Sequence, residues 1–260
     1  MSEDILSRQP PPADLRLSYG SDPNQFLDLR LPANKGKTCP LIINIHGGYW
    51  RAKYDLNHAG HMCAALTAKG LATANLEYRR VGNEGGGWPG TFADIRSAHQ
   101  FLIQNAQKNG FDTQRTIVMG HSAGGQLALC LAGHESRIKG AISLAGVIDL
   151  ERAYQLHLSN DAVVEFLHGT PTEVPDHYRE ADPMALSIAT TRQWLVHGIA
   201  DDVVPPAFSR DYVDRKNKRA GKDKEDVHLL EIAGADHFDV IDPLSKAWKQ
   251  IEQTVLSVVA

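Results

Sequence analysis

Ser122 stands in the run Gly-His-Ser-Ala-Gly-Gly, between the apolar stretch TIVM and a helix-like stretch, QLALCLAG. A serine hydroxyl is a weak nucleophile until a base takes its proton, and a tight strand-to-helix turn holds it where a base can reach. Glycines two residues before and after Ser122 leave room for such a turn. The run alone arises often by chance, and the alternative is a glycine-rich turn with an incidental serine. The flanking elements favour a nucleophile.

An acid and a histidine follow Ser122 in the chain order that such a turn predicts. Asp201 and Asp202 come after the apolar run QWLV, and His237 comes after the next one, VHLLEI. The carboxyl ends of parallel strands share one edge of a sheet, where active sites collect. His237 there would accept the serine proton and return it to the leaving group, oriented by one of the two acids. From these residues alone the acid is either Asp201 or Asp202.

The chain has twelve histidines, so a single histidine carries little weight. Surface or core positions are the alternative for each of them. His58 falls in a helical stretch and His121 inside the serine turn, whereas His237 combines a loop after a strand with the expected chain order. We therefore expect His237 to be the base.

The run HGGYW follows the apolar stretch LIINI and could stabilise a developing oxyanion. Two glycines let the chain approach a substrate closely, so the N–H groups of Gly48 and Tyr49 could join that of Ala123. The alternative is a glycine loop needed only for a tight connection. Candidate substrate-binding residues are the aromatic side chains of Trp50, Phe166 and Tyr178, each of which could instead be a packing residue.

Short apolar runs alternate with helical stretches from residue 41 onward, which predicts an α/β fold with a mostly parallel sheet covered by helices on both faces. Two earlier extended runs, 15–19 and 26–31, predict an antiparallel N-terminal hairpin. We expect one domain over 1–260 with a small helical lid inserted at about 146–191. The expected strands cover 41–45, 71–76, 115–120, 138–145, 194–198 and 227–232, and the expected helices lie near 55–69 and 91–108 and begin at 123.

Composition narrows the classes of partner. The formal net charge of −4 and the sequence pI near 6.3 are not typical of proteins that bind nucleic acid or anionic lipid. No apolar run is long enough for a membrane helix, and the acidic, proline-containing start does not look like an export signal. Three scattered cysteines predict neither disulfides nor a metal site, so we expect a cytoplasmic protein without metal or cofactor.

The motifs GHSAGG, HGGYW, EYRRVG with WPGTFAD, HGIADDVVP and DHFDVID together resemble the α/β-hydrolase superfamily over nearly the whole chain. The HGGxW form and the Phe-Asp after His237 are most similar to kynurenine formamidases (arylformamidases) and to feruloyl and acetyl esterase-like relatives. In such enzymes the acid stands three residues after the glycine of the HG turn, which is Asp201 here.

The resemblance implies an α/β-hydrolase fold and a serine hydrolase that cleaves a small-molecule ester or formyl-arylamide through an acyl-enzyme. The alternatives are a prolyl-oligopeptidase-type peptidase, which usually carries a large additional domain, and a non-catalytic hydrolase-fold binding protein. An exposed lid or last strand could also support a homodimer.

Overall fold

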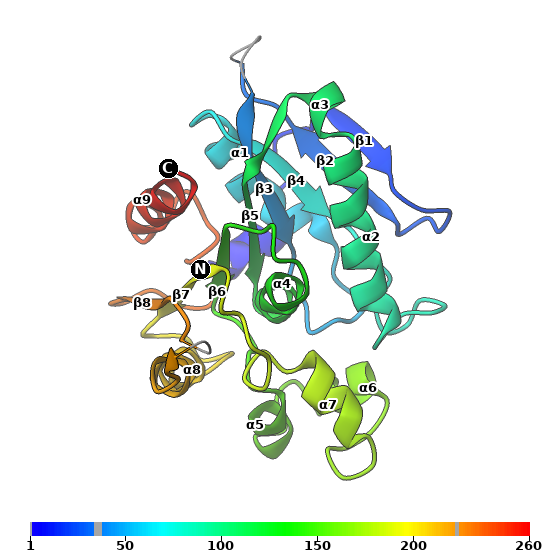
Figure 1. Cartoon of the computed structure of the whole chain (residues 1–260), viewed down its shortest axis with the longest axis vertical. Helices are drawn as coiled ribbons and strands as arrows, with labels where there is room; N and C mark the ends of the chain where they lie inside the picture. The colour runs from blue at the N-terminus through cyan, green and yellow to red at the C-terminus, as the bar shows by residue number, and fades with distance from the viewer. Residues whose placement is uncertain (1, 34–37, 222–223) are drawn as a thin grey trace.

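The computed structural model describes residues 2–33, 38–221 and 224–260. Its centre is an eight-stranded sheet with the spatial order β1-β2-β4-β3-β5-β6-β7-β8, drawn in Figure 1. β1 and β2 pair antiparallel, β2 pairs antiparallel with β4, and the remaining neighbours are parallel. The strands are β1 (Leu15–Ser18), β2 (Phe26–Arg30), β3 (Cys39–Ile45), β4 (Ala72–Leu76), β5 (Phe111–His121), β6 (Gly140–Leu144), β7 (Arg192–Gly198) and β8 (Val227–Ile232).

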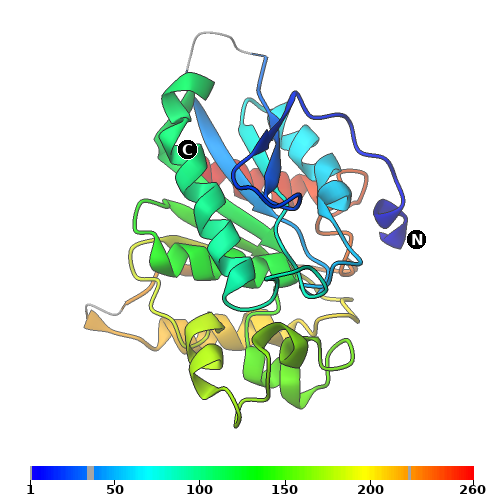
Figure 2. The same ribbon diagram turned by 90° about the vertical axis from the view of Figure 1, so that its right-hand side faces the viewer.

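Helices cover both faces of the sheet, as parallel strands require because their connections cross over the faces. Figures 1 and 2 show α1 and α9 on one side and α2 and α4 on the other. The helices are η1 (Ser2–Leu6), η2 (Leu56–Ala59), α1 (Gly60–Thr67), α2 (Gly90–Gln104), α3 (Ala106–Asn109), α4 (Ala123–His134), α5 (Leu150–Gln155), α6 (Ala162–Leu167), α7 (Pro175–Ala181), α8 (Ala207–Asn217) and α9 (Trp248–Val259).

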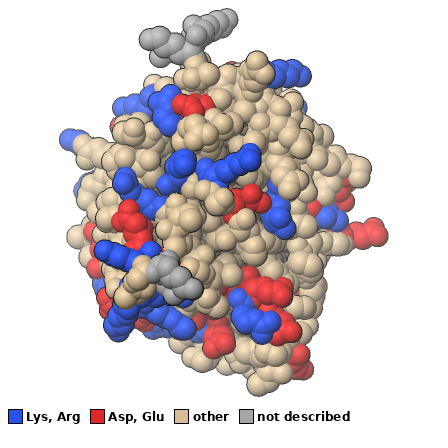
Figure 3. All heavy atoms as spheres, viewed as in Figure 1, with Lys and Arg blue, Asp and Glu red and all other residues tan. Residues whose placement is uncertain are grey.

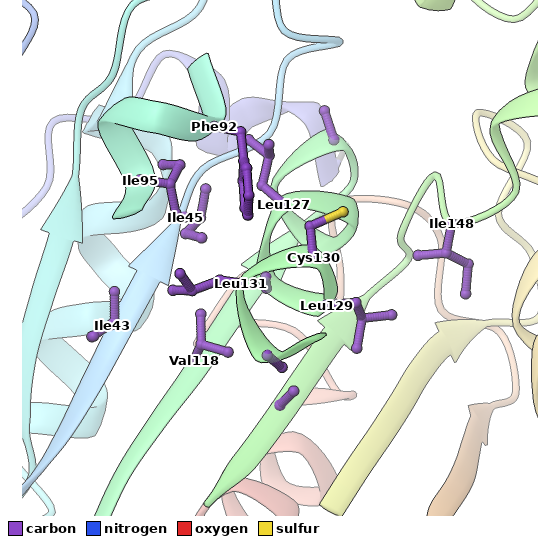
Figure 4. Close-up of a cluster of buried hydrophobic side chains, with 14 of the residues drawn as sticks. Ile43, Ile45, Phe92, Ile95, Val118, Leu127, Leu129, Cys130, Leu131 and Ile148 are labelled. Carbon is purple, nitrogen blue, oxygen red and sulfur yellow. The ribbon is translucent and has the colours of Figure 1, made fainter. Parts of the chain in front are cut away.

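The sheet separates two apolar clusters, one under each layer of helices. α4 is buried along most of its length because it lies between the sheet and α2. Close packing at this position holds the N-terminal end of α4, and thus the residue before it, in a fixed place relative to the strands. Figure 4 shows side chains that meet there, among them Phe92 and Ile95 from α2, Leu127 and Leu131 from α4, and Ile45 and Val118 from the strands.

The structure confirms the expected α/β fold with its antiparallel N-terminal pair. The largest differences from the expected elements are an earlier start of β5 and a break in one expected helix. β5 begins at Phe111, because its first residues pair with β3 across a register shift between Pro40 and Leu41. The stretch expected as one helix near 91–108 is α2 followed by α3, with a break at Asn105. The segment 146–191 carries three short helices, α5, α6 and α7.

Basic and acidic side chains are interspersed on the face of the molecule drawn in Figure 3. The ion pairs of the described residues include Arg79 with Asp94 at 2.7 Å and Arg192 with Asp226 at 3.1 Å. Among the described residues, no helix is both long and apolar enough to cross a membrane.

Candidate active site

Ser122 lies in the turn between β5 and α4, at the carboxyl end of the parallel strands. Its φ of 54° and ψ of −120° are unfavourable for a residue with a side chain, at a cost of about 1–3 kcal/mol. A Cβ at Gly120 would overlap the carbonyl oxygen of Gly124, and a Cβ at Gly124 would overlap that of Ile45. The glycines on either side of Ser122 are therefore required by backbone contact, and the turn lifts the serine out of the strand.

His237 donates a hydrogen bond from Nδ1 to Asp201 Oδ2 at 2.7 Å, and both residues are buried. The other oxygen of Asp201 accepts from the backbone N–H groups of Val203 at 2.9 Å and Val204 at 2.8 Å. Burial acts to raise the pKa of Asp201, but hydrogen bonds from His197 and His237 outweigh it and lower this pKa below its ordinary value. The carboxylate is thus charged at neutral pH. With its proton on Nδ1, His237 keeps Nε2 free to accept one.

His197 contacts Asp201 from a second direction. Its Nε2 lies 3.2 Å from Asp201 Oδ2 and donates to the carbonyl oxygen of Val204 at 2.9 Å, while Nδ1 accepts from the Ser209 hydroxyl at 2.7 Å. These partners hold the His197 ring in the tautomer with its proton on Nε2. This nitrogen can therefore only donate to Asp201. Asp202, in contrast, is exposed.

The loop after β3 brings further backbone N–H groups to the site. Gly48, Tyr49 and Trp50 have φ angles of 116°, 50° and 57°, a left-handed run that turns the backbone sharply. Among the described residues, the N–H groups of Gly48, Tyr49 and Ala123 donate to no protein acceptor. The Tyr49 hydroxyl donates to the Val203 carbonyl at 3.2 Å, which ties this loop to the one that carries Asp201.

A cavity of about 260 Å³ is lined by Ser122, by His237 and by Gly48 and Tyr49 of the loop after β3. Within the described residues, no hydrogen bond joins Ser122 Oγ to His237 Nε2, a contact that often tightens only when substrate binds.

Over the same ranges, no cluster of three His, Cys, Asp or Glu residues is arranged to hold a metal ion. The lining residues are Glu3, Leu6, Gly48, Tyr49, Tyr54, His58, His121, Ser122, Val203, His237 and Phe238.

For two of these lining residues, His58 and His121, the sequence predicts only ordinary core or surface positions. The His121 ring lies 4.5 Å from that of His237, and its Nε2 donates to the His237 carbonyl at 2.9 Å. Burial and the neighbouring imidazole of His237 lower the pKa of His121 far below its usual value. His121 is thus neutral and packs against His237. Its place inside the serine motif is the one sequence signal that could have indicated this.

Protonation of His58 should make stability depend on pH. Burial, together with His46, lowers the pKa of His58 from 6.5 to about 3. Between these values the unfolded chain binds a proton that the folded chain excludes, so the free energy of unfolding falls as pH falls, by up to about 1.4 kcal/mol per pH unit. His58→Asn should therefore lose less stability than wild type between pH 7 and pH 4 in urea unfolding.

The matched control for this measurement is the exposed His157, on the segment after α5. His157→Asn should follow the wild-type dependence of stability on pH. Parallel curves for wild type and His58→Asn would show that His58 is not excluded from protonation in the folded state.

The structure does not bring Trp50, Phe166 or Tyr178 to the cavity; all three are buried elsewhere. Trp50 donates from Nε1 to Gln126 Oε1 at 3.0 Å and stacks on Phe166 with ring centroids 4.5 Å apart. These contacts anchor the loop after β3 to α4 and to the inserted helices. In this structure these three aromatic residues are packing residues. Within the described chain, no residue of 146–191 lines the cavity.

Known proteins match this chain over most of its length. The family model described as BD-FAE matches residues 27–215. Esterase LipC from Mycobacterium tuberculosis is 27% identical over 250 residues, covering 87% of this chain and 60% of the relative. Kynurenine formamidase from Salmo salar is 22% identical over 254 residues, covering 94% and 81%. The chain spans about three fifths of the length of several curated relatives it matches, LipC among them.

Solved structures share the fold. A truncated form of a carbohydrate esterase from gut microbiota superposes with a TM-score of 0.80 at 19% identity, covering 97% of this chain and 99% of that one. At this identity the likeness shows the architecture alone.

Proposed function

Since the chain belongs to the BD-FAE family, we propose that it is a serine hydrolase that cleaves a small carboxylic ester or a formyl-arylamide. The observation that carries this proposal is the 2.7 Å hydrogen bond between His237 and Asp201 beside the cavity that Ser122 also lines. The names of the relatives, an esterase and a formamidase, support the same reaction class. A cavity of about 260 Å³ suits a small substrate.

In the proposed mechanism, the Ser122 Oγ attacks the substrate carbonyl carbon while His237 Nε2 accepts the proton of the Ser122 hydroxyl. The N–H groups of Gly48, Tyr49 and Ala123, which have no described acceptor in the protein, hold the negative oxygen. The tetrahedral intermediate then expels the alcohol or amine, which receives the proton from His237. A water molecule, activated by the same imidazole, hydrolyses the acyl-enzyme and frees Ser122.

Covalent labelling tests this proposal. A fluorophosphonate probe should label the protein, and peptide mapping should place the adduct on Ser122, because only an activated serine reacts quickly with such reagents. Ser122→Ala should abolish labelling, and denatured protein should not label. A folded wild-type protein that stays unlabelled would contradict the proposed nucleophile. Ratios of kcat/KM for N-formylkynurenine and short aryl esters would then separate amidase from esterase.

A further inference from the structure

The N-terminal segment, residues 2–12, reaches the active site although it precedes residue 27, where the family match begins. Ile5 is fully buried in the same apolar cluster as Val240 and Ile241. Arg8 forms an ion pair with Asp242 at 2.6 Å. Figure 2 shows this segment in dark blue along the outside of the molecule, beginning with η1 at the N-terminus. The segment is thus fastened to the loop that carries His237.

A second cavity, of about 290 Å³, adjoins the catalytic one. The two cavities share three lining residues, Leu6, Tyr54 and His58, which therefore form the partition between them. Leu6 is the partition residue contributed by the N-terminal segment, and this residue is 39% exposed. The other residues that line the second cavity are Ser7, Arg8, Gln9, Lys53, Asp55 and Asn57.

Both hydrogen-bond donors and hydrogen-bond acceptors line the second cavity. Arg8 is paired with Asp242, and the Asp55 carboxylate accepts from the backbone and side chain of Asn57 at 2.9 and 3.0 Å. Lys53 Nζ lies 5.4 Å from the centre of the Tyr54 ring. Among the described residues, the side chains of Gln9 and Lys53 have no hydrogen-bonding or ion-pair partner. Because a hydroxyl group both donates and accepts, such a lining suits hydroxyl groups better than a single strong charge.

We propose that the second cavity is a subsite for an uncharged, hydroxyl-bearing leaving group, and that Leu6 determines how such substrates enter it. This inference rests on the proposed hydrolase function. The leaving group receives its proton from His237 and so departs on the His237 side of the site. The N-terminal segment lies on that side, because Ile5 and Arg8 fasten it to the loop of His237.

Three acetates test the subsite. 4-Nitrophenyl acetate reports on the catalytic cavity, while hexyl acetate and glucitol 6-monoacetate have leaving groups of equal carbon number, without and with further hydroxyl groups. Wild type should have the higher kcat/KM for the glucitol ester. Gln9→Ala/Lys53→Ala should lower that value about tenfold, as expected for the loss of two hydrogen bonds, and change the other two less than twofold. Leu6→Ala should raise kcat/KM for both six-carbon esters.

The matched control is Gln107→Ala/Lys108→Ala, the same pair of changes on α3, at the opposite end of β5 from Ser122. This variant should leave all three values unchanged. The subsite is overturned if wild type shows no preference for the glucitol ester, or if the control lowers it equally. Failure of wild type to hydrolyse 4-nitrophenyl acetate would count against the proposed function instead.

Discussion

Ser122→Ala should lower kcat for 4-nitrophenyl acetate by about 10⁵-fold or more, because the acyl-enzyme path is lost and only binding and oxyanion stabilisation remain. The variant keeps its Cβ, so the strained turn with φ of 54° is retained. The midpoint of thermal unfolding should therefore stay within a few degrees of wild type. Initial rates with purified variant, and circular dichroism for the fold, provide the measurements.

Ser143 supplies the matched control for this prediction. It is also buried, lies on β6 next to Gly125, and its hydroxyl has no described hydrogen-bond partner. It does not line the catalytic cavity. Ser143→Ala should therefore leave kcat within about threefold of wild type. If Ser122→Ala retained more than a hundredth of the wild-type rate, or if both variants lost equal activity, Ser122 would not be the nucleophile.

Asp201→Asn should lower kcat by about 10⁴-fold with little change in structure. The backbone N–H groups of Val203 and Val204 donate to one oxygen of Asp201, so they would hold the amide oxygen of the substituted side chain in that place. The amide NH₂ would then face His237 and donate to Nδ1, which moves the imidazole proton to Nε2. In that tautomer His237 cannot accept the proton of Ser122.

Asp202→Asn is the control for this change, because Asp202 is adjacent in sequence but exposed. It removes the same formal charge and should keep nearly full activity. A loss of activity in Asp202→Asn with a normal rate in Asp201→Asn would reverse the assignment of the acid. Comparable modest losses in both would show that neither carboxylate orients the base.

The lowered pKa of Asp201 adds a stability effect to the catalytic one. Its charged form is stabilised in the folded state, so its contribution is fully present above the unfolded pKa of about 3.9. That contribution is lost as pH falls toward the lower folded value. Asp201→Asn should accordingly cost stability at neutral pH and flatten the dependence of unfolding on pH in acid, as urea unfolding at several pH values can measure.

The order of the strands and helices could be predicted from sequence, because apolar periodicity and turn residues act over a few neighbouring positions. Because these patterns are local, the serine turn and the loops of Asp201 and His237 could also be located from the sequence. Once the sheet is parallel, the carboxyl ends of its strands meet at one edge, and the hydrogen bond between His237 and Asp201 at 2.7 Å lies there. The strand pattern fits Asp201 and Asp202 equally, and only the family resemblance distinguishes Asp201.

By itself, then, the sequence determined the fold class and the candidate groups for nucleophile, acid, base and oxyanion donors. Only the tertiary structure decided what surrounds them. It buries Trp50, Phe166 and Tyr178 as packing residues and places Leu6 and His58 along the cavity. Leu6 and Ser122 are 116 positions apart in the chain. The lining of a cavity arises from packing between segments that are far apart in the chain. No local pattern of residues encodes which distant side chain will fill a given space.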